Sequence, residues 1–230
     1  MIGTVDNPDL AGKVIQGFWS TNEKLAKVGM KILESAGFKC LFCGFVSRSS
    51  KMIPHGYMCP VDVSHPGLAA LTTKGGICLC PLCASALAIN WAVVEHPAPH
   101  GEVLPVAGSL IWLPEIKQSK LSIISTYIAV STNCLDVTHP LADTLSHADI
   151  SFRGRKAHLA SNIPLYKEDS DSDFARALAL LPNEFHSSRN EIMSGVRFWP
   201  NSSFWNKQAK YWIQATYRPL EKANTYFDEV

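Results

Sequence analysis

The chain has 230 residues, of which 47% are hydrophobic and 18% charged, and its formal net charge at pH 7 is +1. A chain of this length and polarity can bury a sizeable core, so it is expected to be globular rather than disordered. The near-neutral charge excludes the global basic footprint of many nucleic-acid-binding domains. The most apolar runs are too short to span a membrane and no secretory signal is visible, which predicts a cytoplasmic protein with reduced thiols.

The first part of the chain predicts two helices around a Pro- and Gly-rich stretch. Residues 20–23 (STNE) are typical of a capping box and predict that a helix follows, with Gly37 as its stop. Residues 44–79 contain several Pro and Gly residues and predict a hairpin with loops. A second helix is expected from Cys83 to about Glu95. Its inward residues are expected to be Leu87, Trp91 and Val94.

Further along, residues 96–108 (HPAPHGEVLPVAG) are expected to break all regular structure. Residues 109–115 (SLIWLPE) predict a short buried strand that Pro114 ends. A helix of about twelve residues should follow, because apolar residues then recur at helical spacing. These apolar residues are Leu121, Ile124 and Ile128.

The pattern then weakens, and residues 136–170 are interpreted as a linker or irregular segment between residues 1–135 and a C-terminal part, 171–230. The segment holds a local basic patch, Arg153, Arg155 and Lys156. Residues 171–182 predict a short helix, since they begin with Asp and Ser and end with Pro. The tail is rich in aromatic residues, which either cover the core or form a docking surface for a partner. They are Phe204, Trp205, Tyr211, Trp212 and Tyr217.

Seven cysteines carry the main chemical signal. They are Cys40, Cys43, Cys59, Cys78, Cys80, Cys83 and Cys134. Two C-x-x-C pairs, at 40–43 and 80–83, each direct two sulfurs at one point, and together they offer the tetrahedral four-sulfur shell that zinc prefers. The alternative is two unrelated pairs of buried thiols. Cys59 or Cys78 could also replace a ligand, and Cys134 is expected in the core.

Zinc held by four thiolates has no open coordination position, so the predicted site is structural and cannot activate water. It should stabilise the fold, because an unfolded chain has no preformed site. The predicted cofactor is therefore one structural zinc ion on Cys40, Cys43, Cys80 and Cys83. Catalysis would need a second metal and other residues.

Two C-x-x-C pairs around a hairpin, followed by a helix, resemble the treble clef of the HNH nuclease superfamily. The resemblance implies an α+β fold, with 1–135 as an HNH-like zinc-binding domain and additional helices. It also implies a catalytic His on the hairpin, an Asn before the second pair and a His or Asn after its last Cys. Here His65 has no neighbouring Asp or His, no Asn lies between the pairs, and Ala84 follows Cys83. Asn90 is interpreted as a polar helix residue, and no catalytic residue is assigned.

A more specific resemblance rests on three segments in order: CLFCGF, CLCPLCASALAINWA and GSLIWLPEIKQSKLSIIS. They are similar to the IcmJ/DotN family of type IVB secretion systems, and a weaker similarity appears at VRFWP. The likeness covers mainly residues 20–130. It implies a non-catalytic adaptor of a Dot/Icm-like secretion or conjugation coupling complex, cytoplasmic and peripherally associated with the inner membrane. The implied partners are the C-terminal tail of the coupling ATPase and other secretion adaptors.

Two alternatives come from another class of function. A divergent HNH-type nuclease or DNA-processing factor is favoured by the fold resemblance and by the basic patch at residues 153–156. A bare zinc-finger DNA binder is disfavoured by the near-neutral charge, and nucleic acid is not an expected partner. Salt-sensitive DNA binding and divalent-metal cleavage that is lost in His65→Ala would separate these alternatives from the adaptor.

Overall fold

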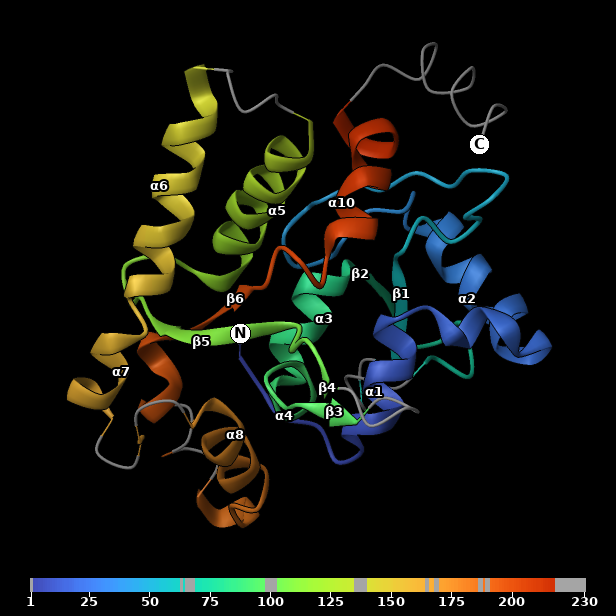
Figure 1. Ribbon diagram of the computed structural model, residues 1–230. Coiled ribbons are helices and arrows are strands. Elements are labelled where there is room, and N and C mark those ends of the chain that lie inside the picture. The colour runs from blue at the N-terminus through green and yellow to red at the C-terminus, as the bar shows by residue number, and fades with distance from the viewer. Residues whose placement is uncertain are drawn as a thin grey trace.

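The structure is a computed structural model. It describes residues 2–62, 64, 69–97, 103–134, 140–163, 166–167, 170–185, 188 and 191–217. The fold is mixed α+β, with helices predominating and three antiparallel two-stranded sheets among the described residues (Figure 1). His65 and the expected tail beyond Tyr217 lie outside the described residues.

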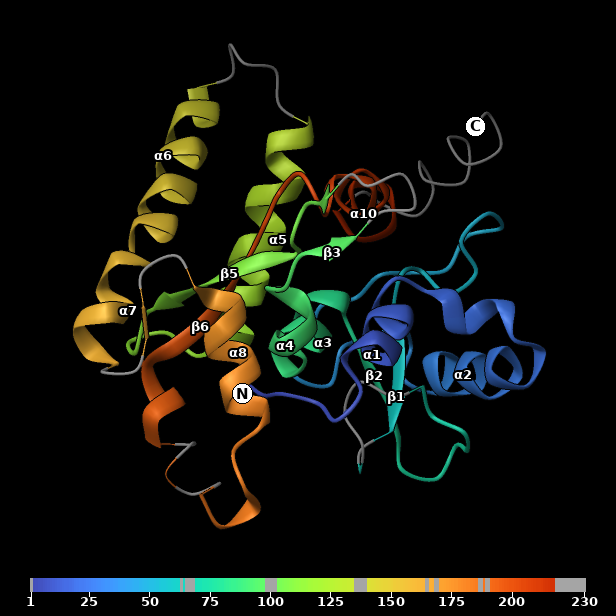
Figure 2. The same ribbon diagram turned by 60° about the horizontal axis from the view of Figure 1, so that its bottom comes forward.

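The N-terminal half holds two helices, a hairpin and a helix pair. The bounds are α1 Pro8–Ile15, α2 Glu23–Ser35, β1 Cys59–Asp62, β2 Gly76–Leu79, α3 Pro81–Leu87 and α4 Ile89–Ala92. A short 3-10 helix, η1 (Phe18–Thr21), joins α1 to α2. Figures 1 and 2 show α1, α2 and the β1–β2 hairpin on one side of the molecule, with α3 and α4 near its centre.

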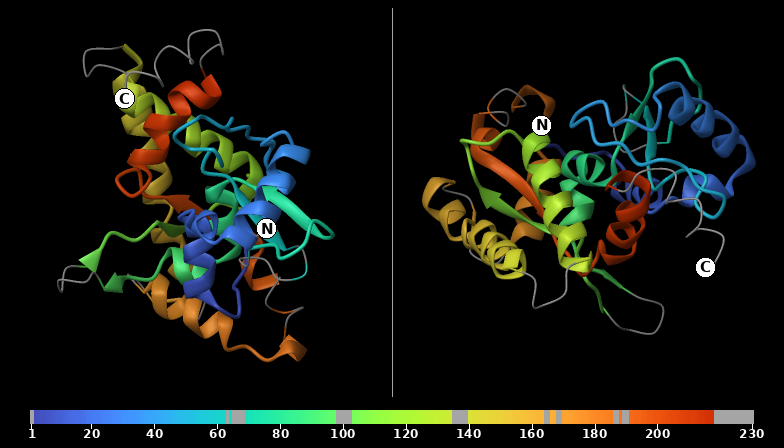
Figure 3. Two further views of the ribbon diagram at one scale, coloured as in Figure 1. Left: turned by 90° about the vertical axis from the view of Figure 1, so that its right-hand side faces the viewer. Right: turned by 90° about the horizontal axis from the view of Figure 1, so that it is seen from above.

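The second half adds a ribbon of two strands and the remaining helices. The bounds are β3 His96–Pro97, β4 Val103–Leu104, β5 Gly108–Trp112, α5 Gln118–Cys134, α6 Pro140–Gly154, α7 Ala157–Asn162, α8 Asp171–Ala179, β6 Val196–Pro200 and α10 Asn206–Trp212. Short turns are η2 Asn183–Phe185 and η3 Met193–Gly195, and a π-helical turn, η4, spans Ile213–Tyr217. Figure 3 shows α5 and α6 side by side, with α10 next to α5.

The predicted helix after residues 20–23 is confirmed, but its cap differs. Asn22 rather than Ser20 is the N-cap of α2, and its side chain accepts a hydrogen bond from the Leu25 amide at 3.1 Å. Ser20 lies inside η1. Gly37 follows the helix with φ +59°, a left-handed conformation that glycine adopts without strain. The helix therefore starts two residues later than a cap at Ser20 would place it.

The single helix expected from Cys83 to about Glu95 is wrong in its continuity. It is split at Ala88, whose φ and ψ of −123° and 52° are not helical, and α4 ends at Ala92. The cause lies in the N-terminal segment: the Ile89 amide donates to the Gly3 carbonyl at 3.1 Å instead of continuing the helix. Leu87 and Trp91 are nevertheless buried, as predicted.

Asn90 holds the N-terminal segment in place through two hydrogen bonds to Val5. Its Oδ1 accepts from the Val5 amide at 3.1 Å, and its Nδ2 donates to the Val5 carbonyl at 2.7 Å. A side-chain amide can imitate a neighbouring strand in this way, because it carries one acceptor and two donors. Asn90 is a polar residue of helix α4, as predicted, and it is buried.

The strand predicted at 109–115 is confirmed as β5, and its partner β6 is a strand that the sequence interpretation missed. Leu110 pairs with Phe198 and Ser109 with Trp199. Because side chains alternate along a strand, the ribbon separates two cores. Leu110 and Phe198 belong to the main core, whereas Ile111 and Trp199 face a smaller core shared with α5 and α6.

Gln118 joins this ribbon to α5. Its Oε1 accepts from the Phe198 amide at 2.8 Å, and its Nε2 donates to the Phe198 carbonyl at 3.0 Å. The helix predicted here is confirmed, although α5 has 17 residues rather than about twelve. The expectation that residues 96–108 lack regular structure is wrong, because the short strands β3 and β4 pair there.

The irregular segment expected over 136–170 is also wrong in its described part, which contains α6 and α7. Leu145, Ala148 and Phe152 of α6 pack on the smaller core, and Phe152 stacks on Trp199 with ring centroids 4.5 Å apart. The short helix predicted at 171–182 is confirmed as α8. The division into domains remains a prediction.

Candidate metal centre

The first cysteine pair lies in a tight turn between two segments joined by a bridge, Lys39 to Val46. The Cys40 amide donates to the Phe45 carbonyl at 2.8 Å, and the Gly44 amide donates to the Cys40 carbonyl at 2.9 Å. Gly44 has φ +77°, a conformation that side-chain-bearing residues rarely adopt, so the glycine after the second Cys is needed to close the turn. The turn directs the Cys40 and Cys43 sulfurs to the same side.

The second pair begins α3 directly after β2. Cys80 is the N-cap of α3, and its Sγ accepts a hydrogen bond from the Cys83 amide at 3.4 Å. Pro81 occupies the first helical position, where its missing N–H costs nothing. The strand, the cap and the proline together fix the positions of both sulfurs.

The hairpin β1–β2 brings the two pairs together. The Leu41 amide donates to the Cys78 carbonyl at 2.9 Å, which ties the first turn to the strand that leads into the second. All four sulfurs lie within 4.8 Å of one another, and Sγ of Cys43 is 3.6 Å from Sγ of Cys80. Tetrahedral zinc with Zn–S bonds of about 2.3 Å requires sulfurs about 3.8 Å apart. The four cysteines therefore fit a zinc ion.

The electrostatics of the cluster favour a cation. The pKa of the Cys40 thiol is lowered, because Cys43, Cys80 and Cys83 donate hydrogen bonds to its thiolate. Burial and the same shared hydrogen bonds raise the pKa of Cys80, and hydrogen bonding to Cys40 raises that of Cys83. Without a metal, the protein therefore stabilises one thiolate in the cluster and disfavours ionisation of Cys80 and Cys83. A divalent cation would supply the missing charge and hold all four as thiolates.

Cys59 and Cys78 are not part of the cluster. They lie at neighbouring register positions of β1 and β2, where Cys59 pairs with Leu79 and Cys78 with Pro60, and both are almost fully buried. Burial first, and repulsion from nearby cysteines second, raise the pKa of both thiols. They are therefore neutral, apolar groups of the core. The side chain of Cys134 lies outside the described residues.

No catalytic group lies beside the four cysteines in the part of the chain that the structure describes. Ala84 and Ser85, which follow Cys83, are buried in α3, and Ser85 Oγ has no hydrogen-bond partner. Asp62 Oδ1 accepts from the Ser64 amide at 2.7 Å, a local turn contact. His65, the candidate base on the hairpin, lies outside the described residues.

His55, the other histidine between the pairs, is partly buried. Its Nδ1 accepts from the Tyr57 amide at 3.1 Å, and its ring makes edge contacts with Trp19 and Tyr57. Burial lowers its pKa, which keeps the ring neutral. Its position in this aromatic cluster gives it a packing role.

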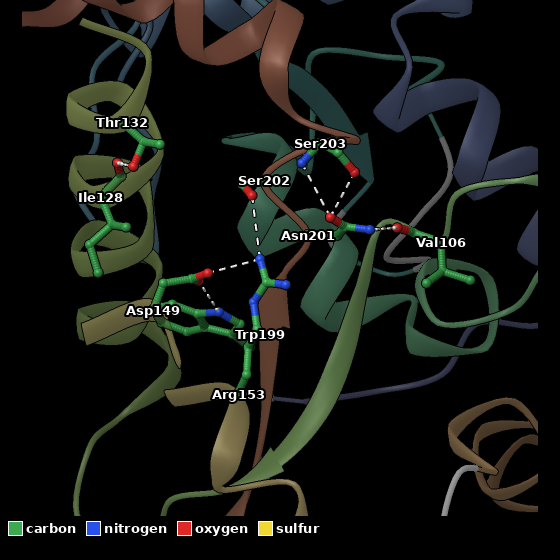
Figure 4. A network of polar contacts seen from close by, with 9 residues as sticks. All are labelled: Val106, Ile128, Thr132, Asp149, Arg153, Trp199, Asn201, Ser202 and Ser203. Atoms are coloured by element: carbon green, nitrogen blue, oxygen red, sulfur yellow. Dashed lines mark hydrogen bonds and ion pairs between the residues drawn. The ribbon is translucent and has the colours of Figure 1, made fainter. Parts of the chain in front are cut away.

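The predicted basic patch is neutralised by carboxylates. Arg153 pairs with Asp149 at 2.8 Å, as Figure 4 shows, and Asp149 also accepts from Trp199 Nε1 at 2.9 Å. Arg155 lies 3.9 Å from a carboxylate oxygen of Glu115. Lys156 Nζ lies 3.6 Å from a carboxylate oxygen of Asp171, the buried first residue of α8. A phosphate backbone would have to compete with all three carboxylates.

The aromatic residues of the tail mostly cover the core. Trp205 and Trp212 are fully buried, and the Trp205 Nε1 donates to the Ala107 carbonyl at 2.7 Å. Trp212 packs edge-on against Phe45 of the first cysteine turn. The interpretation of the tail as core is therefore confirmed for these tryptophans, whereas Tyr217 remains 42% exposed.

A comparison with known protein families finds no matching family, and a comparison with curated proteins finds no significant match. Within the described residues, no helix combines the length and the apolar character that a membrane span requires.

A groove of about 610 Å³ on the outer side of Cys40 was not foreseen from the sequence. It runs between α2, the first cysteine turn and β2, and Ile32, Ala36 and Ile77 contribute its apolar lining. The signal in the sequence was weak, because Ile77 lies 41 and 45 positions after the other two residues and only the folded hairpin brings them together.

Proposed function

We propose that this protein is a non-catalytic, zinc-stabilised adaptor with an HNH-like treble clef, of the type found in the IcmJ/DotN family. In this proposal it belongs to a Dot/Icm-like type IV secretion or conjugation coupling complex and binds the C-terminal tail of the coupling ATPase. It acts on the cytoplasmic side of the inner membrane without inserting into it.

One observation carries the proposal. The order of cysteine turn, hairpin, cysteine turn and helix supports a treble clef, but the residues after Cys83 in α3 are the buried Ala84 and Ser85, where a nuclease would present a His or Asn. A closed four-sulfur site cannot bind and activate a water molecule. The four sulfurs therefore support a structural metal, and among the described residues no second group of possible metal ligands accompanies them.

The decisive experiment uses purified components. The full chain is mixed with the cytoplasmic C-terminal extension of the coupling ATPase from the same genome, and binding is measured by calorimetry. A complex with micromolar or tighter affinity is expected, and the same ATPase lacking its extension is the control. Failure of the extension to bind at about 100 μM, a hundredfold weaker than micromolar affinity, would contradict the adaptor role.

The divergent nuclease remains a second candidate, because the order of cysteine turns and hairpin resembles that of HNH enzymes. It predicts cleavage of plasmid DNA with Mg²⁺ or Mn²⁺, lost in His65→Ala, and DNA affinity that falls steeply with salt. The carboxylates that face Arg153 and Arg155 argue against it. We expect no cleavage above that of a Cys80→Ser control.

A further inference from the structure

The groove beside the metal centre has an apolar lining and a wide mouth. Its apolar lining includes Ile32 of α2, Ala36 at the C-cap of that helix and Ile77 of β2, and Leu41, which also lines it, is 63% exposed. Figure 1 shows α2 next to the β1–β2 hairpin, and the pair is fixed by direct packing of the helix on both strands. A volume of about 610 Å³ is in the range of pockets that bury a ligand.

The edge of β2 that borders this groove is only partly occupied by other backbone groups of the chain. Pro60 pairs in register with Cys78, but its carbonyl accepts from the Ala70 amide at 3.1 Å, on the opposite side of β1. Opposed residues of an antiparallel pair either exchange both backbone bonds or neither, so Cys78 also turns its backbone groups away from β1. Its carbonyl accordingly accepts from Leu41, which borders the groove.

Two backbone groups of β2 remain for a ligand. The Cys78 amide points to the groove side, and the Gly76 carbonyl does so as well, because the two orientations alternate along a strand. Neither has a partner among the described residues outside the hairpin. Cys78 is almost fully buried, and a buried amide needs an acceptor. An extended segment laid along β2 supplies an acceptor and a donor at this spacing.

The rim of the groove is basic. Lys39 lines it, Lys74 follows the lining residue Thr73, and Lys31 lies one helical turn before the lining residue Ser35. All three lysines are exposed, and no carboxylate lines the groove. Within the described part of the chain, none of the three forms an ion pair. A basic rim around an apolar floor is complementary to a segment in which acidic and apolar residues alternate.

We infer that this groove binds an acidic, apolar segment of a partner protein as an added strand along β2. Apolar side chains of the segment occupy the floor, and its carboxylates meet Lys39 in the lining and Lys31 and Lys74 next to lining residues in the sequence. Five residues span about 17 Å, which matches one short strand. The inference deepens the proposed adaptor function and rests on it only for the identity of the partner.

Model peptides test the chemistry without any secretion component. A fluorescein-labelled EVEIEVE peptide is titrated with the zinc-loaded full chain and followed by fluorescence anisotropy. We expect saturable binding of EVEIEVE that weakens with salt, and no binding of KVKIKVK. Methylation of the central amide of EVEIEVE should weaken binding roughly tenfold, because one hydrogen bond to β2 is then lost. Equal binding of the acidic and basic peptides would overturn the inference.

Matched variants locate the site. Lys39→Glu with Lys74→Glu should weaken the acidic peptide roughly tenfold, because each reversal replaces an attraction by a repulsion. Lys13→Glu with Lys51→Glu makes the same charge change on exposed residues away from the groove and should leave affinity unchanged. Zinc content and melting temperature verify that each variant is folded. Equal losses in both pairs would refute a specific groove.

Other occupants give different results. A second copy of this chain on the β2 edge would appear as a dimer in light scattering that Lys39→Glu alters, and it would overturn the inference. The two proposals also fail separately. If the ATPase extension binds the Lys39→Glu, Lys74→Glu variant as tightly as the wild type, the groove assignment is wrong and the adaptor role stands. If EVEIEVE binds in the groove but the extension does not bind at all, the reverse holds.

Discussion

Replacing Cys80 by serine separates its role as a metal ligand from its role as a helix cap. The Cys80 sulfur is buried, lies 3.6 Å from the Cys43 sulfur and accepts from the Cys83 amide at 3.4 Å. Serine is a favourable N-cap, so Cys80→Ser keeps the contact to the Cys83 amide and avoids the cap loss of about 1 kcal/mol. What it removes is one of four thiolates.

The expected magnitude follows from the metal. Structural zinc contributes about 10–16 kcal/mol in small zinc domains, so one ligand of four corresponds to about 2.5–4 kcal/mol. That is roughly a 10²- to 10³-fold loss of zinc affinity. In a chain of this length, 1 kcal/mol shifts the melting temperature by about 2–4 °C, so a fall of at least about 5 °C is expected.

The assay is metal analysis together with thermal melting in the presence of a zinc-binding dye. The wild type should hold one zinc ion per chain, whereas Cys80→Ser should release its zinc to the dye. Cys59→Ala is the matched control, because Cys59 is equally buried but lies outside the cluster. It should lose some stability and keep its zinc. A Cys80→Ser protein with one tightly held zinc would show that Cys80 is not a ligand.

Three further changes test the rest of the structure. His55→Asn keeps an acceptor for the Tyr57 amide but cannot titrate. Burial lowers the pKa of His55, so the unfolded chain takes up a proton at this residue before the folded chain does as pH falls below 6.5. The wild type should therefore lose stability between pH 7.5 and 5.5 more steeply than His55→Asn. The measurement is urea denaturation with excess zinc. Parallel slopes would exclude this role. Gln118→Leu leaves the buried amide and carbonyl of Phe198 without partners and should cost about 2–5 kcal/mol in urea denaturation, whereas Gln118→Glu, which keeps an acceptor, should cost less. Asn90→Leu should speed hydrogen exchange at residues 2–5 while zinc content stays unchanged, and unaltered exchange would show that Asn90 does not hold this segment in place.

The metal centre could be predicted from the sequence because its determinants are local. A C-x-x-C turn with a following glycine, and a Cys at the cap of a helix with Pro next to it, fix four sulfurs almost independently of the rest of the chain. The β1–β2 hairpin then only has to bring the two cysteine pairs together. The same reasoning placed Cys59 and Cys78 as alternatives, and only the strand register separates them from the cluster.

The missed elements depend on contacts between distant segments. The break at Ala88 follows from Gly3, which is 85 residues away and takes the backbone bond of Ile89. Strand β6 exists because β5 and the side chain of Gln118 supply its partners from either side. In helix α6 the apolar residues do not follow a clear helical spacing. Its apolar face can be recognised only in the folded structure, where Trp199 stacks on Phe152. Periodicity within one segment contains none of this information.

The contacts around α3 bear on the proposed absence of catalysis. Ala84 and Ser85, the two residues after Cys83, pack inside the molecule between the helices that surround α3. A histidine there would have to displace core side chains, which costs stability through overpacking. Asn90, the nearest amide along the chain, is committed to Val5. The groove beside Cys40 and a smaller pocket lined by Leu41, Phe42 and Cys83 both border the four cysteines. The apolar lining of the groove is the feature on which the proposed peptide binding rests.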